Sequence, residues 1–229
     1  MQAEHAGIAL SLALLSLVLS GLAVQGLARA ARDRSRHQLM FGIGLSFGTA
    51  ALLIELAAYV GLVTGWLLQS YVFLSAAIVG VLSLGSARAF RPGRFEGIYT
   101  AYIAAVGAAV GWWSFTTPLS ATMVQHGVIV GNPPLVLLLL SSLMTVPATM
   151  VLVVAAVLHL RRSFRPQGLL MISGASVLGA GGFLYIASFP VMLYYAEFVG
   201  ILMLFLGLTD LSRLGLARPA ASPSERSSV

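Results

Sequence analysis

Two carboxylates lie inside apolar stretches of this chain, and they are the side chains whose presence most needs a chemical explanation. Glu55 is part of "LLIELAAYV", residues 52–60, and Glu197 is part of "YYAEFVG", residues 194–200. A charged side chain near the centre of a membrane helix costs about 2.5 to 3.5 kcal/mol on insertion scales. A carboxylate in such a place therefore accepts hydrogen bonds from the protein, holds a cation, or stays neutral.

Several polar or aromatic groups are predicted to share one layer with these two glutamates. Tyr59 follows Glu55 by one helical turn, and Tyr194 precedes Glu197 by three residues. Trp112, at the end of one apolar stretch, and His126, in the connection after it, are expected at the same level. The candidate ligand-binding residues are therefore Glu55, Tyr59, Trp112, His126, Tyr194 and Glu197.

The sequence leaves two interpretations of the glutamates open. In the first, each is a protonated side chain that hydrogen-bonds to a neighbouring helix, for example to a tyrosine or a serine. In the second, they belong to an outward-facing polar pocket for a cation, a proton or a small ligand. Burial and a nearby like charge both favour the neutral form, so we expect at least one of the two to be protonated at neutral pH.

The elements that must hold these residues are membrane-spanning helices. Of the 229 residues, 59% are hydrophobic and 9% are charged, and the mean hydropathy is +0.95. Ordinary soluble domains contain about 25% charged residues. Apolar stretches of about 20 residues, long enough to cross a hydrocarbon core, recur almost end to end. The sequence predicts an all-α fold: a polytopic membrane protein that forms a seven-transmembrane-helix bundle.

The predicted membrane domain covers residues 1–212, and a flexible cytoplasmic tail covers 213–229. The tail contains "RPAASPSERSSV", which has too little apolar content to order itself. The first span is longer than the apolar core of a signal peptide and no basic stretch precedes it, so we expect it in the mature protein. The seven spans are expected at about 6–29, 38–64, 68–90, 97–116, 134–160, 168–188 and 190–211.

All basic residues are arginines, and their positions predict the orientation of the bundle. With seven spans, all 13 fall on one side of the membrane. The positive-inside rule then places the N-terminus outside and the C-terminus in the cytoplasm. Span 2 is expected to run outward to Thr64, which puts Glu55 nine residues, or about 13 Å, below the outer surface. The arginines are Arg29, Arg32, Arg34, Arg36, Arg88, Arg91, Arg94, Arg161, Arg162, Arg165, Arg213, Arg218 and Arg226.

Two further patterns concern the packing of the bundle. The connection over 117–133 is long, half apolar and bounded by prolines. We expect it to form either an interfacial helix or a cap over the outer end of the bundle. Small residues at a spacing of four, such as Gly44 and Gly48, are predicted to let helix backbones approach each other closely.

The residue inventory argues against several kinds of chemistry. The chain has no cysteine, which removes disulfides, thiolate metal sites and thiol catalysis. No histidine lies deep enough in a span to ligate a haem, and HExxH, GxSxG and phosphate-loop motifs are missing. We therefore expect no cofactor, no metal site and no catalytic residue. A non-enzymatic protein is favoured over a membrane enzyme acting on lipid, because no nucleophile and base occur at a defined spacing.

Two long stretches and an outer segment with prolines between them form a pattern of glycine, alanine and aromatic spacings. The stretches are "LLIELAAYVGLVTGWLLQSYVFLSAAIVGVLSLGSARAF", residues 52–90, and "GLLMISGASVLGAGGFLYIASFPVMLYYAEFVGILMLFLGL", residues 168–208. In this pattern the chain resembles a group of uncharacterised seven-transmembrane-helix integral membrane proteins of GC-rich bacteria. The resemblance implies the seven-helix architecture and, because that group has no established activity, no particular function.

A second resemblance is rejected on chemical grounds. The string "WWSFTTPL", residues 112–119, is similar to the third helix of microbial rhodopsins. Retinal needs a lysine amine for its Schiff base. This chain has no lysine, so a covalent retinal protein is excluded.

The leading hypothesis is a non-enzymatic polytopic membrane protein with an outward-facing polar pocket for a small ligand or a cation, acting as a ligand sensor or a carrier. The alternative is an accessory or assembly subunit of a larger membrane protein complex, in which the glutamates are interhelical hydrogen-bonding groups. The expected partners are the lipid bilayer, with anionic headgroups at the arginine rim, and no nucleic acid. The expected location is the plasma membrane, with several passes.

Overall fold

Five long helices make up most of the part of the chain that the structure describes. This part of the computed structural model comprises residues 2–90, 93–119, 124–125, 128–129, 133–162, 169–170, 173–174, 177, 198–203 and 206. The long helices are α1 (Gln2–Asp33), α2 (Arg36–Tyr59), α3 (Gly65–Phe90), α4 (Arg94–Thr116) and α5 (Leu135–Arg162).

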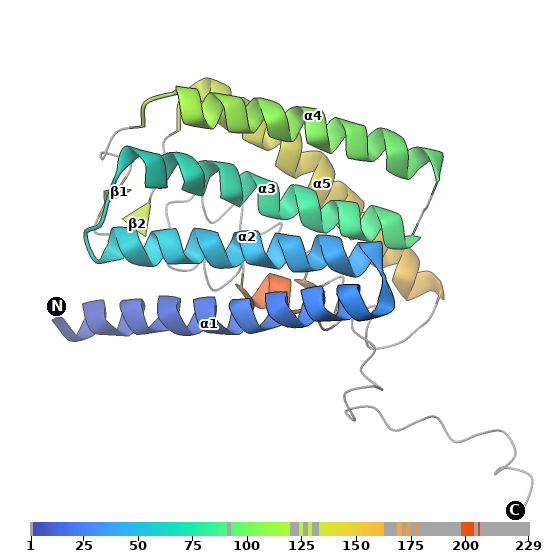
Figure 1. Ribbon diagram of the computed structural model, residues 1–229, viewed down its shortest axis with the longest axis horizontal. Helices are drawn as coiled ribbons and strands as arrows, with labels where there is room; N and C mark the ends of the chain where they lie inside the picture. The colour runs from blue at the N-terminus through green and yellow to red at the C-terminus, as the bar shows by residue number, and fades with distance from the viewer. Residues whose placement is uncertain are drawn as a thin grey trace, which may run out of the picture.

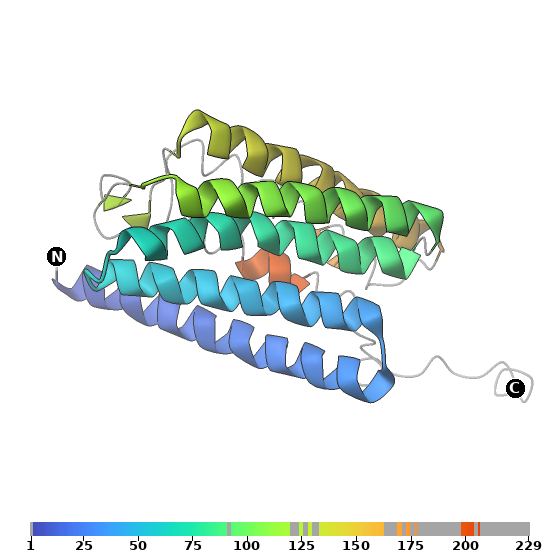
Figure 2. The same ribbon diagram turned by 45° about the horizontal axis from the view of Figure 1, so that its top comes forward.

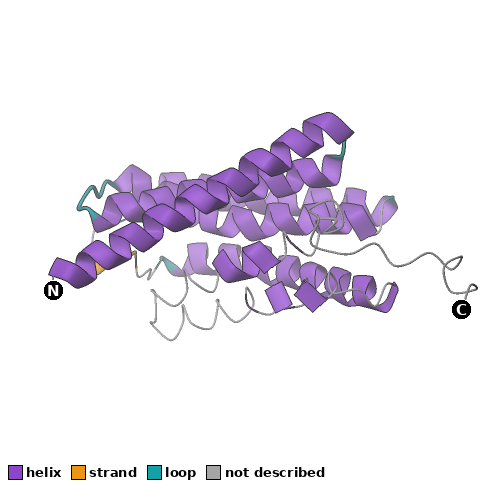
Figure 3. Cartoon of the chain, turned by 90° about the horizontal axis from the view of Figure 1, so that it is seen from below, coloured by secondary structure: helices purple, strands orange, loops and turns teal. Residues whose placement is uncertain are grey.

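Each of these helices is long and apolar enough to cross a membrane. The prediction of a helical membrane protein is therefore confirmed at this level, and helices dominate the described part (Figure 3). The first five predicted spans coincide with the five helices to within a few residues at most ends. Most of the sixth and seventh predicted spans lies outside the described residues.

The helices pack side by side, and α3 is central in the described part of the bundle. Helix α1 packs along α2, α2 packs on α3, and α3 contacts both α4 and α5 (Figures 1 and 2). Large apolar side chains remain exposed on the outer helices, for example Leu17 of α1 (71% exposed) and Leu139 of α5 (60% exposed). A hydrocarbon environment accommodates such side chains, whereas water would not.

Glycines permit the close packing of α2 against both of its neighbours. A Cβ atom on Gly44 would lie 2.8 Å from the Leu82 side chain of α3, and one on Gly48 would lie 2.8 Å from the Leu19 side chain of α1. Both glycines, predicted to let helix backbones approach, therefore make room for a leucine side chain of the neighbouring helix.

The described arginines gather at one end of the bundle, which we call the arginine end. The C-terminal ends of α1, α3 and α5 and the N-terminal ends of α2 and α4 meet there (Figure 1). Arg88 of α3 forms an ion pair with Glu96 of α4 at this end. The arginines concerned are Arg29, Arg32, Arg34, Arg36, Arg88, Arg94, Arg161 and Arg162.

The opposite end carries a short strand pair between α4 and α5. Strand β1 (Val124–Gln125) pairs antiparallel with β2 (Val128–Ile129). The Ile129 side chain is 1% exposed and packs with Ala58, Leu68, Leu119 and Leu137. We call Leu119 and the two strands the cap, and this end of the bundle the capped end.

The prediction for this connection was divided between a cap and an interfacial helix. The described residues favour the cap, and the helix is wrong for them, because their regular structure is a strand pair. The side-chain amide of Gln69 on α3 also reaches this end. Its Nε2 atom donates to the carbonyl of Thr117 at 2.9 Å, which satisfies an acceptor just beyond the last turn of α4.

Helix α2 ends earlier than predicted. It stops at Tyr59 instead of near Thr64, because Gly61 adopts a positive φ of 86°. The amide of Leu62 donates to the carbonyl of Ala57 at 2.8 Å, and the amide of Gly61 donates to the carbonyl of Ala58 at 3.0 Å. These two bonds form a Schellman motif, which closes a helix around a left-handed glycine.

Pro147 interrupts the backbone hydrogen bonds of α5, and the bundle compensates for it. Proline has no amide hydrogen, so the carbonyl of Leu143, four residues earlier, loses its helical donor. The Tyr102 hydroxyl of α4 donates to this carbonyl at 2.5 Å. The hydroxyl therefore replaces the missing amide as the donor to a carbonyl that lipid cannot hydrogen-bond.

Candidate functional site

Glu55 is the most deeply buried carboxylate among the residues whose exposure the structure describes. Its side chain is 1% exposed. The backbone amide of Ile129 in β2 donates a hydrogen bond to Glu55 Oε1, with a nitrogen–oxygen distance of 3.3 Å. The first feature of the site is therefore a carboxylate on a membrane helix that binds the backbone of the cap.

The position of Glu55 near the end of α2 explains how it reaches the cap. Because α2 ends at Tyr59, Glu55 is four residues from the end of the helix, or about 6 Å along its axis. The sequence had predicted nine residues to the end of span 2. Gly48 and Leu52 precede Glu55 by seven and three residues, so all three lie on one face of the helix.

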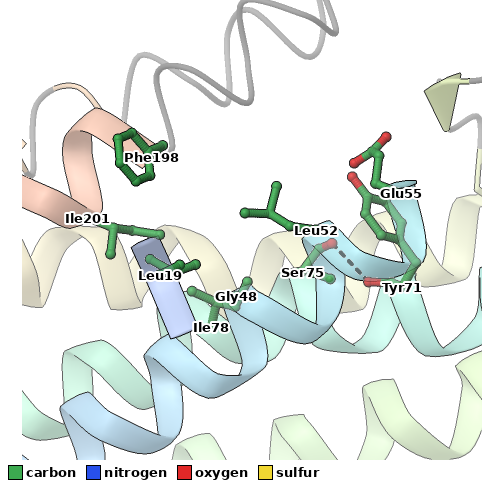
Figure 4. A pocket seen from close by; sticks show the side chains of 10 residues that line it. Leu19, Gly48, Leu52, Glu55, Tyr71, Ser75, Ile78, Phe198 and Ile201 are labelled. Atoms are coloured by element: carbon green, nitrogen blue, oxygen red, sulfur yellow. Dashed lines mark hydrogen bonds between the residues drawn. The ribbon is translucent and has the colours of Figure 1, made fainter. Parts of the chain in front are cut away.

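A matching face of α3 lies opposite. Tyr71, Ser75 and Ile78 follow each other at spacings of four and three, which also places them on one face. The Ser75 hydroxyl donates to the Tyr71 carbonyl at 2.8 Å. Figure 4 shows the Tyr71 ring extending from α3 toward the Glu55 carboxylate.

These two faces enclose a pocket with contributions from two further segments. Its lining residues are Leu19, Gly48, Ala51, Leu52, Glu55, Tyr71, Ser75, Ile78, Phe198 and Ile201. Glu55 lies at one end of the pocket and Phe198 and Ile201 lie at the other (Figure 4). The space open to water is about 20 Å³, which is enough for about one water molecule.

The lining of the pocket is apolar apart from three side chains. Glu55, Tyr71 and Ser75 supply a carboxylate and two hydroxyls, and the other members are hydrocarbon, aromatic or glycine. Small-molecule sites share this kind of lining, mostly apolar with a few polar groups, but they are usually much larger than this cavity. Among the described residues, no group of three histidines, aspartates or glutamates is placed to hold a metal ion.

The six residues predicted to bind a ligand have different outcomes. Glu55 lines the pocket, and Tyr59 is half-buried and packs against the apolar cluster beside it. Trp112 lies on α4 with 70% of its surface exposed, and no described residue of α4 lines the pocket. The structure therefore does not bring Trp112 to Glu55. His126, Tyr194 and Glu197 lie outside the described residues.

Trp112 belongs with other exposed aromatics at the capped end. Trp113 is 42% exposed, and Trp66, near the start of α3, is 66% exposed. Amphipathic rings at helix ends with such exposure are typical of an aromatic belt at a membrane surface. Tyr71, near the start of α3, also fits such a belt by its position in the sequence, although its ring extends toward Glu55 (Figure 4).

Comparison with known proteins assigns no family to this chain. No protein-family profile, no curated protein and no solved structure matches the chain. The fold and the site define a helical membrane protein with a buried carboxylate beneath a short cap.

Proposed function

We propose that this protein is a non-enzymatic membrane protein that binds a small ligand or a cation in the pocket at Glu55, as a ligand sensor or a carrier. One observation carries the proposal: a carboxylate that is 1% exposed lines a cavity together with Tyr71 and Ser75. Carboxylates in membrane helices are costly, and they commonly mark ligand, ion or proton sites.

The proposal includes a seven-helix bundle in the plasma membrane, with the N-terminus outside and the pocket near the outer surface. The gathering of the described arginines at the end opposite the cap supports this orientation, because cytoplasmic ends are rich in basic residues. Anionic lipid headgroups are the proposed partners of the arginine end.

The proposal also includes Glu197, the second carboxylate that lies in an apolar stretch. Phe198 lines the pocket, and it directly follows Glu197 in the chain. We propose that Glu197 contributes to the same ligand site, and the variant Glu197→Gln tests this part separately.

Thermal unfolding of the purified protein tests the proposal. The protein is heated in matched ionic strength with chlorides of sodium, potassium, magnesium and calcium, and then with a panel of small organic ions and metabolites. A ligand at about 100 times its Kd adds about 2.7 kcal/mol of stability, so at least one condition is expected to raise Tm by several degrees. Glu55→Gln is expected to abolish this increase, and Ser75→Ala is expected to reduce it.

Asp33→Asn is the matched control for the carboxylate-to-amide change. Asp33 is exposed at the end of α1, at the arginine end, so this variant should keep the full ligand-dependent increase in Tm. If no condition raises Tm of the unmodified protein, or if the increase persists in Glu55→Gln, the proposed pocket is wrong.

A second candidate function is supported by the bond that Glu55 makes. A carboxylate that accepts a hydrogen bond from the protein's own backbone is what we expect of an accessory subunit whose buried glutamates have only a structural role. Purification from the native membrane in mild detergent separates the two functions. A stoichiometric protein partner would support the subunit, and its absence together with a ligand-dependent Tm would support the sensor or carrier.

A further inference from the structure

We propose that Glu55 is a latch that holds the cap against the bundle at one end of the pocket, so that release of the cap controls access to the carboxylate. Control of ligand access rests on the proposed function, whereas the latch itself rests on contacts between described residues. Ile129 attaches the cap to the bundle by two kinds of contact.

The first contact is polar. The amide of Ile129 donates to Glu55 Oε1 across a sequence separation of 74 residues. A buried amide that loses its acceptor is costly. This bond therefore links the closed position of the cap to a single side chain of α2.

The second contact is apolar and explains why the cap needs a latch. The Ile129 side chain is 1% exposed among Ala58, Leu68 and Leu137, which come from three different helices. The strands themselves have only two residues each. So short a strand pair is not stable alone, and its position depends on what it contacts in the bundle.

The placement of the latch couples the cap to the pocket. Glu55 is at once the acceptor for the cap and part of the pocket lining, beside Tyr71 of α3. A cation or a hydrogen-bond donor that binds the carboxylate competes with the Ile129 amide for its oxygens. By thermodynamic reciprocity, ligand binding then favours release of the cap, and release of the cap favours ligand binding.

Cysteine labelling tests the latch without background, because the chain contains no cysteine. Ala58→Cys on α2 and Leu68→Cys on α3 place reporters beneath Ile129, where the native residues are 4% and 1% exposed. Ala87→Cys, in a separate buried cluster near the arginine end of α3, is the control. The full-length protein in detergent is labelled with N-ethylmaleimide, and the labelling rate is measured for each reporter.

The decisive comparison is between two substitutions of Glu55. Glu55→Ala removes the acceptor, and the labelling rates at Ala58→Cys and Leu68→Cys are expected to rise by about tenfold or more. Glu55→Gln keeps an oxygen acceptor in nearly the same place, so the rise should be clearly smaller. The rate at Ala87→Cys should not change with either substitution.

The latch is overturned if Glu55→Ala leaves both reporters beneath the cap protected, or if the rate at Ala87→Cys rises as much as theirs, which indicates general loosening. These results are independent of the ligand screen. A screen without any ligand refutes the proposed function, while the labelling still decides the latch. Where a ligand is found, its addition should raise the rate at Ala58→Cys, and a decrease would refute the competition.

Discussion

Glu55 and Glu96 lie near opposite ends of the same bundle, and the protein accommodates them in opposite ways. Glu96 pairs with Arg88 between α3 and α4, and both side chains keep some exposure, 14% and 30% respectively. Glu55 is almost fully buried and accepts a hydrogen bond from the backbone amide of Ile129. At the arginine end a carboxylate is matched by a side chain at a partly wet surface, whereas at the capped end it is matched by main chain from a distant segment.

This difference teaches where sequence changes should have large effects. A partly exposed ion pair contributes little, because solvent and salt screen it. A buried hydrogen bond to a backbone amide is not screened in this way. Loss of its acceptor also leaves the amide buried without that bond, which is costly. We therefore expect the capped end to be sensitive to substitution and the arginine end to be tolerant.

The largest effect is expected from Ile129→Ala at the capped end, compared with Phe95→Ala at the arginine end. Truncation of a fully buried isoleucine costs about 2 to 5 kcal/mol. Phe95 is 46% exposed and stacks on Tyr99 with ring centroids 5.9 Å apart, so its removal should cost about 0.5 to 1.5 kcal/mol. Denaturant unfolding in detergent measures both, and a larger loss for Phe95→Ala would reverse the comparison.

The next effect concerns the two carboxylates themselves. Glu55→Ala is expected to lower the free energy of unfolding by about 1 to 3 kcal/mol, because the Ile129 amide loses its acceptor. Glu96→Ala should cost about 1 kcal/mol or less. The same unfolding assay measures both variants, and equal losses would show that the cap bond contributes no more than the ion pair.

A smaller effect is expected midway between the two ends, at Tyr102. Tyr102→Phe should cost about 0.6 kcal/mol, which is typical of hydrogen bonds within membrane proteins. In a Pro147→Ala background the new amide can serve the Leu143 carbonyl, so the cost of Tyr102→Phe should fall toward zero. A double-mutant cycle measures this coupling, and additive effects of the two substitutions would contradict the compensation.

The smallest effect is the response to salt. Raising the salt from about 0.05 M to about 0.5 M should shrink the destabilisation caused by Glu96→Ala by a few tenths of a kcal/mol, because screening weakens the ion pair. The destabilisation caused by Glu55→Ala should stay the same within error. A strong salt dependence of the Glu55→Ala effect would place that carboxylate in a wetter environment than the structure gives it.

The sequence was sufficient to predict the helices that residue type and length determine. Hydrophobic runs located five membrane helices, and Gly44 and Gly48 were correctly assigned to close packing. The predicted end of α2 was wrong, because the length and hydropathy of the apolar run favoured a longer helix than Gly61 allows. Gly61 lies just after the last periodic residue of the helix, which is where a left-handed glycine closes a helix.

The candidate site was only partly predictable, for a physical reason. An unusual carboxylate in an apolar run identified Glu55, and side chains of tyrosine, serine, threonine or histidine were predicted as its partners. Its bond to the cap is made with the backbone amide of Ile129, and every residue except proline has such an amide. Residue type therefore carries no information about such a partner, and only the tertiary fold selects it. Tyr71 was missed because its position near a helix end also fits an aromatic belt.

The separation of Glu55 from Ile129 has a consequence for the synthesis of the protein. The ribosome completes Glu55 74 residues before Ile129, an interval of about 4 to 15 s at ordinary elongation rates of about 5 to 20 residues per second. Helix α2 is therefore presented to the insertion machinery before the amide that binds its glutamate exists. The apolar residues around Glu55 must therefore supply the free energy of membrane insertion. A second polar residue in α2 should reduce the yield of inserted protein, even where the folded protein would tolerate that residue.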